Sequence, residues 1–296
     1  MKKFKIPQIR IKKSFWWYMG GAAVLIAGLI FSVVADKPDG KLHVNFYDVG
    51  QGDAILIETP ENHQILVDGG PSSTILSKLS EDLPFYDKSL DMVVITHPHA
   101  DHIDGLIDVL EHYSVNEVLM TGINYTSSDY TELKNLIKGK KISIKIAFSG
   151  QEISWGDGPI IKILEPEKSL RGKRIENLNN SSIVLKIEYE SKAELLTGDF
   201  ENSAQDKISS DYLTEFRANV LKVAHHGSKN GLSLRFLTAV KPEYVVISVG
   251  ADNRYGHPAE DLLDLVSKYS VYRTDLDGDI FTSVDSAGKL EVSTQK

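Results

Sequence analysis

The chain has 296 residues, of which 42% are hydrophobic and 25% are charged, a balance that is ordinary for a globular protein and excludes a disordered one. It contains no cysteine, which excludes disulfides, cysteine-ligated zinc and a cysteine nucleophile, so any metal must be held by His, Asp and Glu. The net charge is −8, and an acidic chain is not expected to hold nucleic acid mainly through phosphate contacts.

Residues 1–35 have the pattern of a membrane segment. An uncharged run from Ser14 to Ala35, with aromatic residues at its start, is long enough to span a bilayer. Basic residues before it should stay on the cytoplasmic side, which places the rest of the chain outside. A signal peptide cleaved after Ala35 is the alternative, and it exports the same domain. The basic residues are Lys2, Lys3, Lys5, Arg10, Lys12 and Lys13.

A polar linker is predicted at residues 36–41, followed by one domain over residues 42–296. Without the six basic residues of the N-terminal segment, 27 basic residues stand against 41 acidic ones, a net charge of −14. Any activity on nucleic acid must therefore depend on a local positive field and not on the overall charge.

Apolar runs and turn signals alternate along this domain. In its first part we expect strands at residues 42–47, 54–58, 64–67 and 92–95, with helices at 73–83 and 103–112. In its second part we expect strands at 160–164, 183–189, 193–196, 220–223 and 244–248, with helices from about 201 and near 232–240 and 259–268. Two halves that each pass from strands to strand–helix units predict a layered α/β sandwich.

The strongest chemical signal is a histidine-rich segment directly after the buried strand at residues 92–95. His97 and His99, one residue apart on extended backbone, can converge on one metal ion. Asp101 and His102, at the turn into the helix, can reach a second ion nearby. Imidazole and carboxylate are the ligands expected of Zn²⁺, and of harder ions where oxygen dominates.

Two further motifs stand at strand ends. Thr197-Gly198-Asp199 places a carboxylate just beyond an apolar strand, where it can bridge two cations. His225-His226-Gly227-Ser228 places a histidine pair beyond another strand. Each motif is weak alone, but dinuclear sites take their ligands from several separate strand ends.

Taken in order, the His-x-His-x-Asp-His, Thr-Gly-Asp and His-His-Gly-Ser motifs resemble the signature of the metallo-β-lactamase superfamily. The chain looks most like the extracellular hydrolase (nuclease) domain of the ComEC competence-protein family. Residues 48–53, 66–70, 254–258 and 272–278 also match that pattern. The resemblance implies an αββα sandwich, here preceded by a single N-terminal transmembrane segment, with two divalent metal ions between the sheet edges.

The resemblance also implies roles for individual residues. His97 and His99 would bind the first metal, Asp101 and His102 the second, and Asp199 would bridge them. The His225-His226 pair would supply another ligand, His225 being preferred. A bridging hydroxide would attack phosphorus, with Asp101 and Asp199 holding the catalytic metals. The groups expected to contact the phosphate or protonate the leaving oxygen are His226 and His257, with Ser228 and Thr274 as further phosphate contacts.

The sequence departs from the wider superfamily at one ligand. Many members place a third histidine for the first metal before the bridging aspartate, whereas this chain has residues 179–182, Asn-Asn-Ser-Ser, in that stretch. His112 lies between the motifs but too far along its helix. An amide or water oxygen would then complete the first site, which leaves Mn²⁺ open beside Zn²⁺.

The expected function is that of a membrane-tethered, extracytoplasmic phosphodiesterase or nuclease acting on DNA. The membrane channel of ComEC proteins has no counterpart in this sequence, so a separate DNA-uptake channel is an expected partner. A cell-envelope phosphodiesterase, of the teichoic-acid type, is the alternative, and the domain's acidity favours it. A non-catalytic metal-binding membrane module also stays open, while the missing third histidine argues against β-lactam or thioester hydrolysis.

Overall fold

The computed structural model describes residues 15–24 and 38–296, which fall into two units, Met1–Asp39 and Gly40–Lys296. Residues 15–24 are helical. Within the described ranges, no helix combines the length and the apolar character that crossing a bilayer requires. The other parts of the predicted anchor, residues 1–14 and 25–35, lie outside the described residues, so the anchor stays a prediction.

Two β-sheets form the centre of the second unit. The strand order of the larger sheet is β15 (Leu290–Thr294), β14 (Ile280–Val284), β1 (Leu42–Phe46), β2 (Ile55–Glu58), β3 (Gln64–Val67), β4 (Ser89–Ile95), β5 (Ser114–Met120) and β6 (Ser143–Ile146). That of the smaller sheet is β13 (Ser270–Arg273), β12 (Tyr244–Ile247), β11 (Val220–Lys222), β10 (Lys192–Leu196), β9 (Val184–Tyr189), β8 (Ile160–Glu165) and β7 (Glu152–Ile153). Each sheet has one antiparallel and one parallel half: β3 to β6 are parallel in the first, and β10 to β13 in the second.

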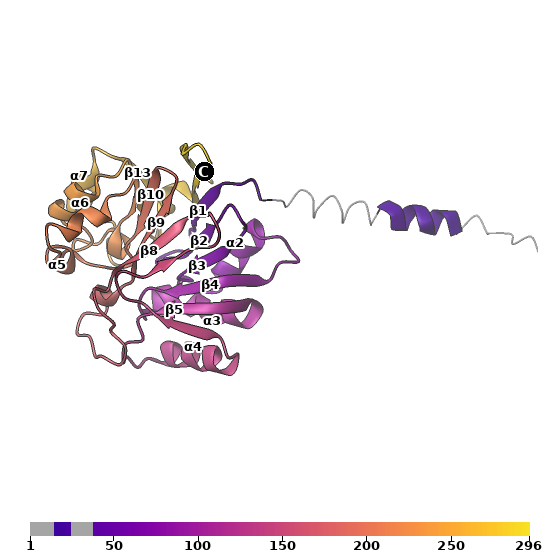
Figure 1. The fold of residues 1–296 in the computed structure, drawn as a ribbon, viewed down its shortest axis with the longest axis horizontal. Coiled ribbons are helices and arrows are strands. Elements are labelled where there is room, and N and C mark those ends of the chain that lie inside the picture. The colour runs from indigo at the N-terminus through magenta and orange to yellow at the C-terminus, as the bar shows by residue number, and fades with distance from the viewer. Residues whose placement is uncertain (1–14, 25–37) are drawn as a thin grey trace, which may run out of the picture. The chain divides into compact units, whose positions relative to one another are not determined.

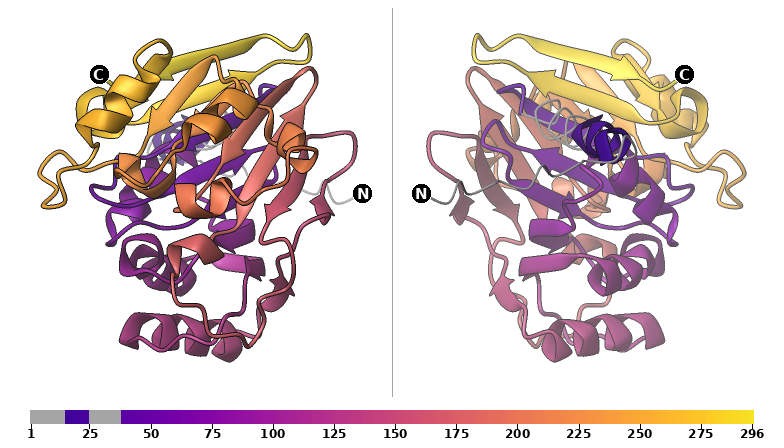
Figure 2. Two further views of the ribbon diagram at one scale, coloured as in Figure 1. Left: turned by 90° about the vertical axis from the view of Figure 1, so that its left-hand side faces the viewer. Right: turned by 90° about the vertical axis from the view of Figure 1, so that its right-hand side faces the viewer.

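Helices cover the outer face of each sheet, so the unit has four layers (Figure 1). The helices are α2 (Thr74–Asp82), α3 (Ala100–His112), α4 (Ser128–Gly139), α5 (Asn202–Gln205), α6 (Leu234–Val240), α7 (Glu260–Val266) and α8 (Thr274–Asp277), with 3-10 turns η1 (Asn179–Ser181), η2 (Tyr212–Phe216) and η3 (Ala224–Gly227). The left panel of Figure 2 looks onto the side of α6 and α7, whose ribbons lie in front of the strands. The predicted αββα sandwich is confirmed.

The apolar core lies between the two sheets. Val44, Phe46 and Ile57 of the larger sheet and Leu185 and Ile187 of the smaller one belong to one buried cluster. One further buried cluster lies between the larger sheet and its helices, and another lies between the smaller sheet and its helices. Strands buried on both faces read as nearly continuous apolar runs, which is why they could be predicted.

The structure contains several elements that the sequence analysis did not predict, including β7 and the C-terminal elements β13, α8, β14 and β15. The segment from β5 to β6, including α4, was not predicted, because β5 is exposed over its first half and its buried residues are few. The polar helix expected from about Glu201 is only the single turn α5. None of these differences changes β4, β10 or β11, whose ends carry the candidate ligands, as is usual for ligand sites in α/β proteins.

A buried carboxyl group joins the two sheets. Glu194 of β10 is 1% exposed, and its oxygens accept hydrogen bonds from the Thr282 hydroxyl of β14 at 2.8 and 3.0 Å. Burial raises the pKa of Glu194 to about 8, although the hydrogen bond from Thr282 opposes that shift. The folded protein therefore holds a proton here that the unfolded chain loses near its ordinary pKa of 4.5.

This carboxyl group should make stability fall with rising pH. Between the unfolded pKa and about 8, the folded state binds more protons at Glu194, so the free energy of unfolding decreases as pH rises. Glu194→Gln removes this term. The variant should gain roughly 2 to 4 kcal/mol over the wild type between pH 5 and pH 8, measured by urea unfolding. Glu132→Gln, at an exposed position, is the control; equal pH dependence in both variants would contradict the assignment.

Candidate metal centre

The histidine-rich segment forms the turn between β4 and α3. His97 and His102 are fully buried, while His99 and Asp101 are partly exposed. The His97 ring lies 4.7 Å from the His99 ring and 4.2 Å from the His102 ring, centroid to centroid. His99 caps α3 in an extended conformation, and Asp101 lies in the first helical turn, where the helix dipole favours negative charge.

Asp199 lies between the histidines. It follows β10 and is 1% exposed. Its Oδ2 lies 3.5 Å from His97 Nε2 and 3.4 Å from His102 Nε2, and its Oδ1 lies 3.8 Å from His226 Nε2. The Ser182 hydroxyl accepts a hydrogen bond from the Asp199 backbone at 3.1 Å. One carboxylate thus faces groups from both sheets, as a bridging ligand requires.

His226 completes the cluster from the end of β11. Its Nε2 lies 3.3 Å from Asp101 Oδ2, and its Nδ1 lies 3.0 Å from the Ser248 carbonyl oxygen. A proton on Nδ1 donated to that carbonyl leaves the Nε2 lone pair free for a metal ion.

His225 points elsewhere. Its Nδ1 lies 3.1 Å from Glu201 Oε1 and 3.1 Å from the Ser228 hydroxyl. Both histidines have left-handed backbone, with φ of 51° and 52°, which sends neighbouring side chains in different directions. The geometry therefore favours His226 as the ligand and corrects the sequence-based preference for His225.

Asp68 orients the candidate ligand His102. Asp68 accepts hydrogen bonds from His102 Nδ1 at 2.8 Å and from the Thr96 backbone and hydroxyl at 2.9 and 2.6 Å. This is the buttressing contact that fixes the tautomer of a metal-binding histidine.

A buried ion pair between Lys222 and Asp53 lies next to the cluster. Lys222, with no exposed surface, donates to Asp53 and, at 3.1 Å, to the Gly198 carbonyl. Asp53 Oδ1 in turn lies 3.3 Å from His226 Nδ1. Sequence reasoning missed Lys222. A lysine inside the apolar strand β11 could have indicated a buried ion pair, since lysine is almost never fully buried unless it is paired.

The cluster favours positive charge. Burial lowers the pKa of His226, but Asp199 and Asp53 outweigh it and raise the value to about 9. Burial likewise opposes the charge of His102, yet Asp199 and Asp68 hold its pKa well above the ordinary value. For His97 burial dominates, and its pKa lies well below 6.5. A divalent cation can supply the same positive charge once the protons leave.

Unpartnered ligand atoms test whether metal ions fit. Among the described residues, His102 Nε2, His226 Nε2 and Asp199 Oδ1 are buried and have no hydrogen-bond partner. Such atoms are rare in folded proteins and call for an explanation. In the described part of the chain, four groups of donor atoms lie close enough together to hold one ion, and they are drawn from Asp53, Asp68, His97, Asp101, His102, Asp199 and His226. Nitrogen and carboxylate donors suit both Zn²⁺ and Mn²⁺, so the site fits the expected metals.

Of the remaining predicted residues, some lie beside the cluster and others are not placed to take part in it. His257 lies beside the cluster, with its ring 5.6 Å from the His225 ring and its Nδ1 buried without a partner in the described chain. Ser228 contacts His225. Thr274 is a correction: it is fully buried, and its hydroxyl bonds the Val249 backbone in both directions, so it is not placed to contact a phosphate. His112 bonds the Asp108 carbonyl on α3, away from the cluster.

The segment that replaces the third histidine lies against the first predicted metal position. The Ser182 hydroxyl is 3.3 Å from His97 Nδ1. Asn179 is buried, and its amide nitrogen lies 3.0 Å from Glu201 Oε1. Its amide oxygen has no partner among the described residues. That oxygen is a candidate for the expected amide ligand.

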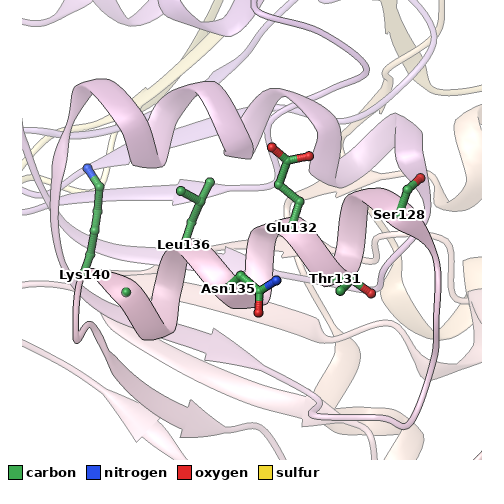
Figure 3. A pocket seen from close by; sticks show the side chains of 7 residues that line it. Ser128, Thr131, Glu132, Asn135, Leu136 and Lys140 are labelled. Carbon is green, nitrogen blue, oxygen red and sulfur yellow. The ribbon is translucent and has the colours of Figure 1, made fainter.

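A separate hollow lies along α4, and it does not belong to the site. About 550 Å³ in volume, it is bordered by Glu132, Leu136 and Lys140, whose side chains point to the same side of the helix (Figure 3). None of the candidate ligands lines it. The chemistry of the chain is therefore concentrated at the strand ends.

The chain is similar in sequence to known competence proteins. The chain is 30% identical over 285 residues to ComE operon protein 3 of Bacillus subtilis, and 29% identical over 260 residues to competence protein ComA of Neisseria gonorrhoeae. These matches cover 88% and 87% of this chain but 35% and 34% of the relatives. The chain thus spans about a third of the length of the competence proteins of the ComEC family that it matches.

Solved structures show the same fold. The metallo-beta-lactamase fold protein YhfI of Bacillus subtilis superposes with a TM-score of 0.52 at 15% identity, covering 85% of this chain and all of that one. The profile of the metallo-beta-lactamase superfamily matches residues 47–251, the span that carries the His, Asp and His-His motifs. This chain belongs to the metallo-beta-lactamase superfamily of metal-dependent hydrolases, and its ComEC-family relatives are competence proteins.

Proposed function

We propose that the chain is a metal-dependent phosphodiesterase that cleaves DNA. The observation that carries the proposal is the buried cluster of Asp199, His102 and His226, with ligand atoms left unpartnered. Similarity to competence proteins over most of the chain supports DNA as the substrate. A separate DNA-uptake channel is the proposed partner.

The proposed ligand roles combine the sequence motifs with the cluster. His97 and Asp199 would hold one ion together with His99, which is carried over from the resemblance because no group of convergent donor atoms among the described residues includes it. Asp101, His102, Asp199 and His226 would hold the other ion. When bound, two divalent cations lower the pKa of water and offset the charge that develops on a phosphate. Ser182, Asp68 and the Ser248 carbonyl keep the ligands oriented through the hydrogen bonds described above.

Two histidines at the mouth are available to the substrate. The His257 and His225 rings lie 5.6 Å apart, neither residue belongs to a group of convergent donor atoms among the described residues, and the His225 side chain is 28% exposed. His257 is proposed to contact the phosphate or protonate the leaving oxygen. The sequence analysis assigned the phosphate contact to His226. Because His226 is proposed here as a metal ligand, His225 is proposed to make that contact instead.

A cell-envelope phosphodiester is the second candidate substrate. DNA binding by an acidic domain gains little from overall charge, so the composition does not single out DNA among phosphodiester substrates. Both candidates use the same site, so a substrate panel separates them.

Phosphodiester hydrolysis should require Asp199. We expect the protein to cleave bis-p-nitrophenyl phosphate and DNA with Zn²⁺ or Mn²⁺, and to leave a β-lactam intact. Asp199→Ala should lower kcat/KM at least roughly a hundredfold, since the bridging carboxylate holds both cations. His112→Ala, on the exposed end of α3, should keep full activity. A glycerophosphodiester polymer cleaved in preference to DNA would shift the function to the cell envelope, and hydrolysis unchanged in Asp199→Ala would contradict the site.

Metal content should separate the paired histidines. His226→Ala should bind about one metal ion per chain where the wild type binds about two, because Nε2 of His226 faces Asp101 and Asp199. His225→Ala should retain both ions. Elemental analysis of the purified variants decides; the reverse pattern would restore His225 as the ligand.

The catalytic domain is proposed to lie outside the cytoplasm and to stay attached to the membrane. Six basic residues before the apolar run set this orientation. Protease added to intact cells or protoplasts should digest the domain and spare a cytoplasmic control protein. Protection until lysis would overturn the topology, and a domain found only in the medium would identify a cleaved signal peptide.

A further inference from the structure

A second cavity opens beside the metal centre. It has a volume of about 450 Å³, within the usual range for small-molecule sites, and the candidate ligand Asp101 forms part of its wall. Arg254 and Tyr255 border it from the loop that follows β12, and Gln51 and Pro71 border it from the larger sheet's side. A substrate whose phosphate lies at Asp101 would extend into this cavity.

The loop that carries Arg254 and Tyr255 is held in place by one side chain. The Asn253 amide nitrogen donates to the carbonyl oxygens of Gly250 and His257 at 2.8 and 2.7 Å. Its amide oxygen accepts from the backbone of Tyr255 and His257 at 3.2 and 3.0 Å. Four hydrogen bonds from one residue order the loop before any ligand binds, which lowers the entropic cost of binding.

An aromatic ring and a cation occupy the tip of this loop. Tyr255 is 56% exposed, and its ring is stacked with that of His257 at 5.7 Å and 26°. The Arg254 guanidinium carbon lies 5.2 Å from the Tyr255 ring centre, and its Nη2 lies 3.2 Å from the tyrosine hydroxyl. A lone exposed tyrosine is unremarkable, but a ring backed by a histidine of the site and joined to an arginine presents a stacking surface next to a positive charge.

We infer that this cavity is a nucleobase subsite, in which the base next to the scissile phosphate stacks on Tyr255 and Arg254 contacts a neighbouring phosphate. The inference rests on the proposed phosphodiesterase function and names the form of its substrate. Stacking needs no net positive charge, and it contributes about 1 to 3 kcal/mol per base. That suits a domain with an excess of acidic residues.

The subsite selects single strands. A base inside a duplex is stacked on its neighbours and cannot lie on a protein ring without leaving the helix, which costs a few kcal/mol. Single-stranded DNA, or a frayed end, offers its bases freely. The cavity therefore favours single-stranded over double-stranded DNA, independently of base sequence, because every base has an aromatic face.

The test measures binding and cleavage of a labelled single-stranded oligonucleotide and of an abasic oligonucleotide of equal length. Tyr255→Ala should weaken binding of the normal strand about 5- to 150-fold, the range that corresponds to one lost stack. Its effect on the abasic strand should be much smaller. Tyr255→Phe, which keeps the ring, should restore binding to near the wild-type level. Tyr86→Ala is the control, because Tyr86 is 49% exposed but precedes β4, at the opposite end of that strand from His97.

The outcomes separate the subsite from the proposed function. Normal binding by Tyr255→Ala, equal losses on normal and abasic strands, or a wild type that binds neither strand would overturn the subsite. If the wild type cleaves phosphodiesters while Tyr255→Ala matches it on DNA, the function stands and the subsite fails. If Tyr255 controls binding of the normal strand but no phosphodiester is cleaved, the subsite stands and the proposed reaction fails.

Discussion

The structure depends on one buried carboxylate, Asp199, which the fold must hold among three histidines at a place with 1% exposure. Burying ionised groups costs several kcal/mol each unless partners compensate. Here neighbouring carboxylates outweigh the effect of burial on the pKa of His102 and His226, yet His102, His226 and Asp199 each keep a buried atom without a hydrogen-bond partner in the described chain. Such an arrangement suits a site prepared for cations better than one built for stability alone.

The backbone around the site fixes the positions of the candidate ligands. The candidate ligands follow the carboxyl ends of parallel strands in both sheets, so the two packed sheets must place these strand ends on the same side of the sandwich for the cluster to exist. Gly198 has a φ of +48°, and a Cβ there would lie 3.1 Å from the Cβ atoms of Ser182 and Thr96. A side chain in that position would strain the turn and push against residues that orient Asp199 and Asp68. Glycine before Asp199 is therefore favoured by both the backbone conformation and the close packing at this turn.

The sequence predicted what spacing alone determines. Four candidate ligands within six residues, after a buried strand, indicated a metal site, and their order along the chain with Asp199 and the histidine pair indicated the fold. Spacing does not determine which of two adjacent histidines turns inward, because that depends on left-handed φ angles at both. Spacing also does not show that the Thr274 hydroxyl is fully hydrogen-bonded to the Val249 backbone, or that Lys222 of the smaller sheet pairs with Asp53, just before β2 of the larger one. These contacts are made between residues far apart in the chain, and no local pattern encodes them.

The negative charge of the domain is compatible with the proposed polyanionic substrate because salt screens charges that lie far from the site. At physiological salt the Debye length is about 8 Å, so a phosphate at the mouth responds to the groups lining the site far more than to carboxylates on remote faces. Within the site, several carboxylates raise the pKa of His102 and His226, which shows that the local field draws positive charge inward. Cations bound there would reverse the sign felt by a phosphate, while the acidic exterior would still disfavour non-specific binding of long duplexes. Affinity must then come from contacts that need no overall charge. An ordered, exposed aromatic ring beside the cluster supplies such a contact, and for that reason the Tyr255 loop belongs with the chemistry of the site and not with the general surface.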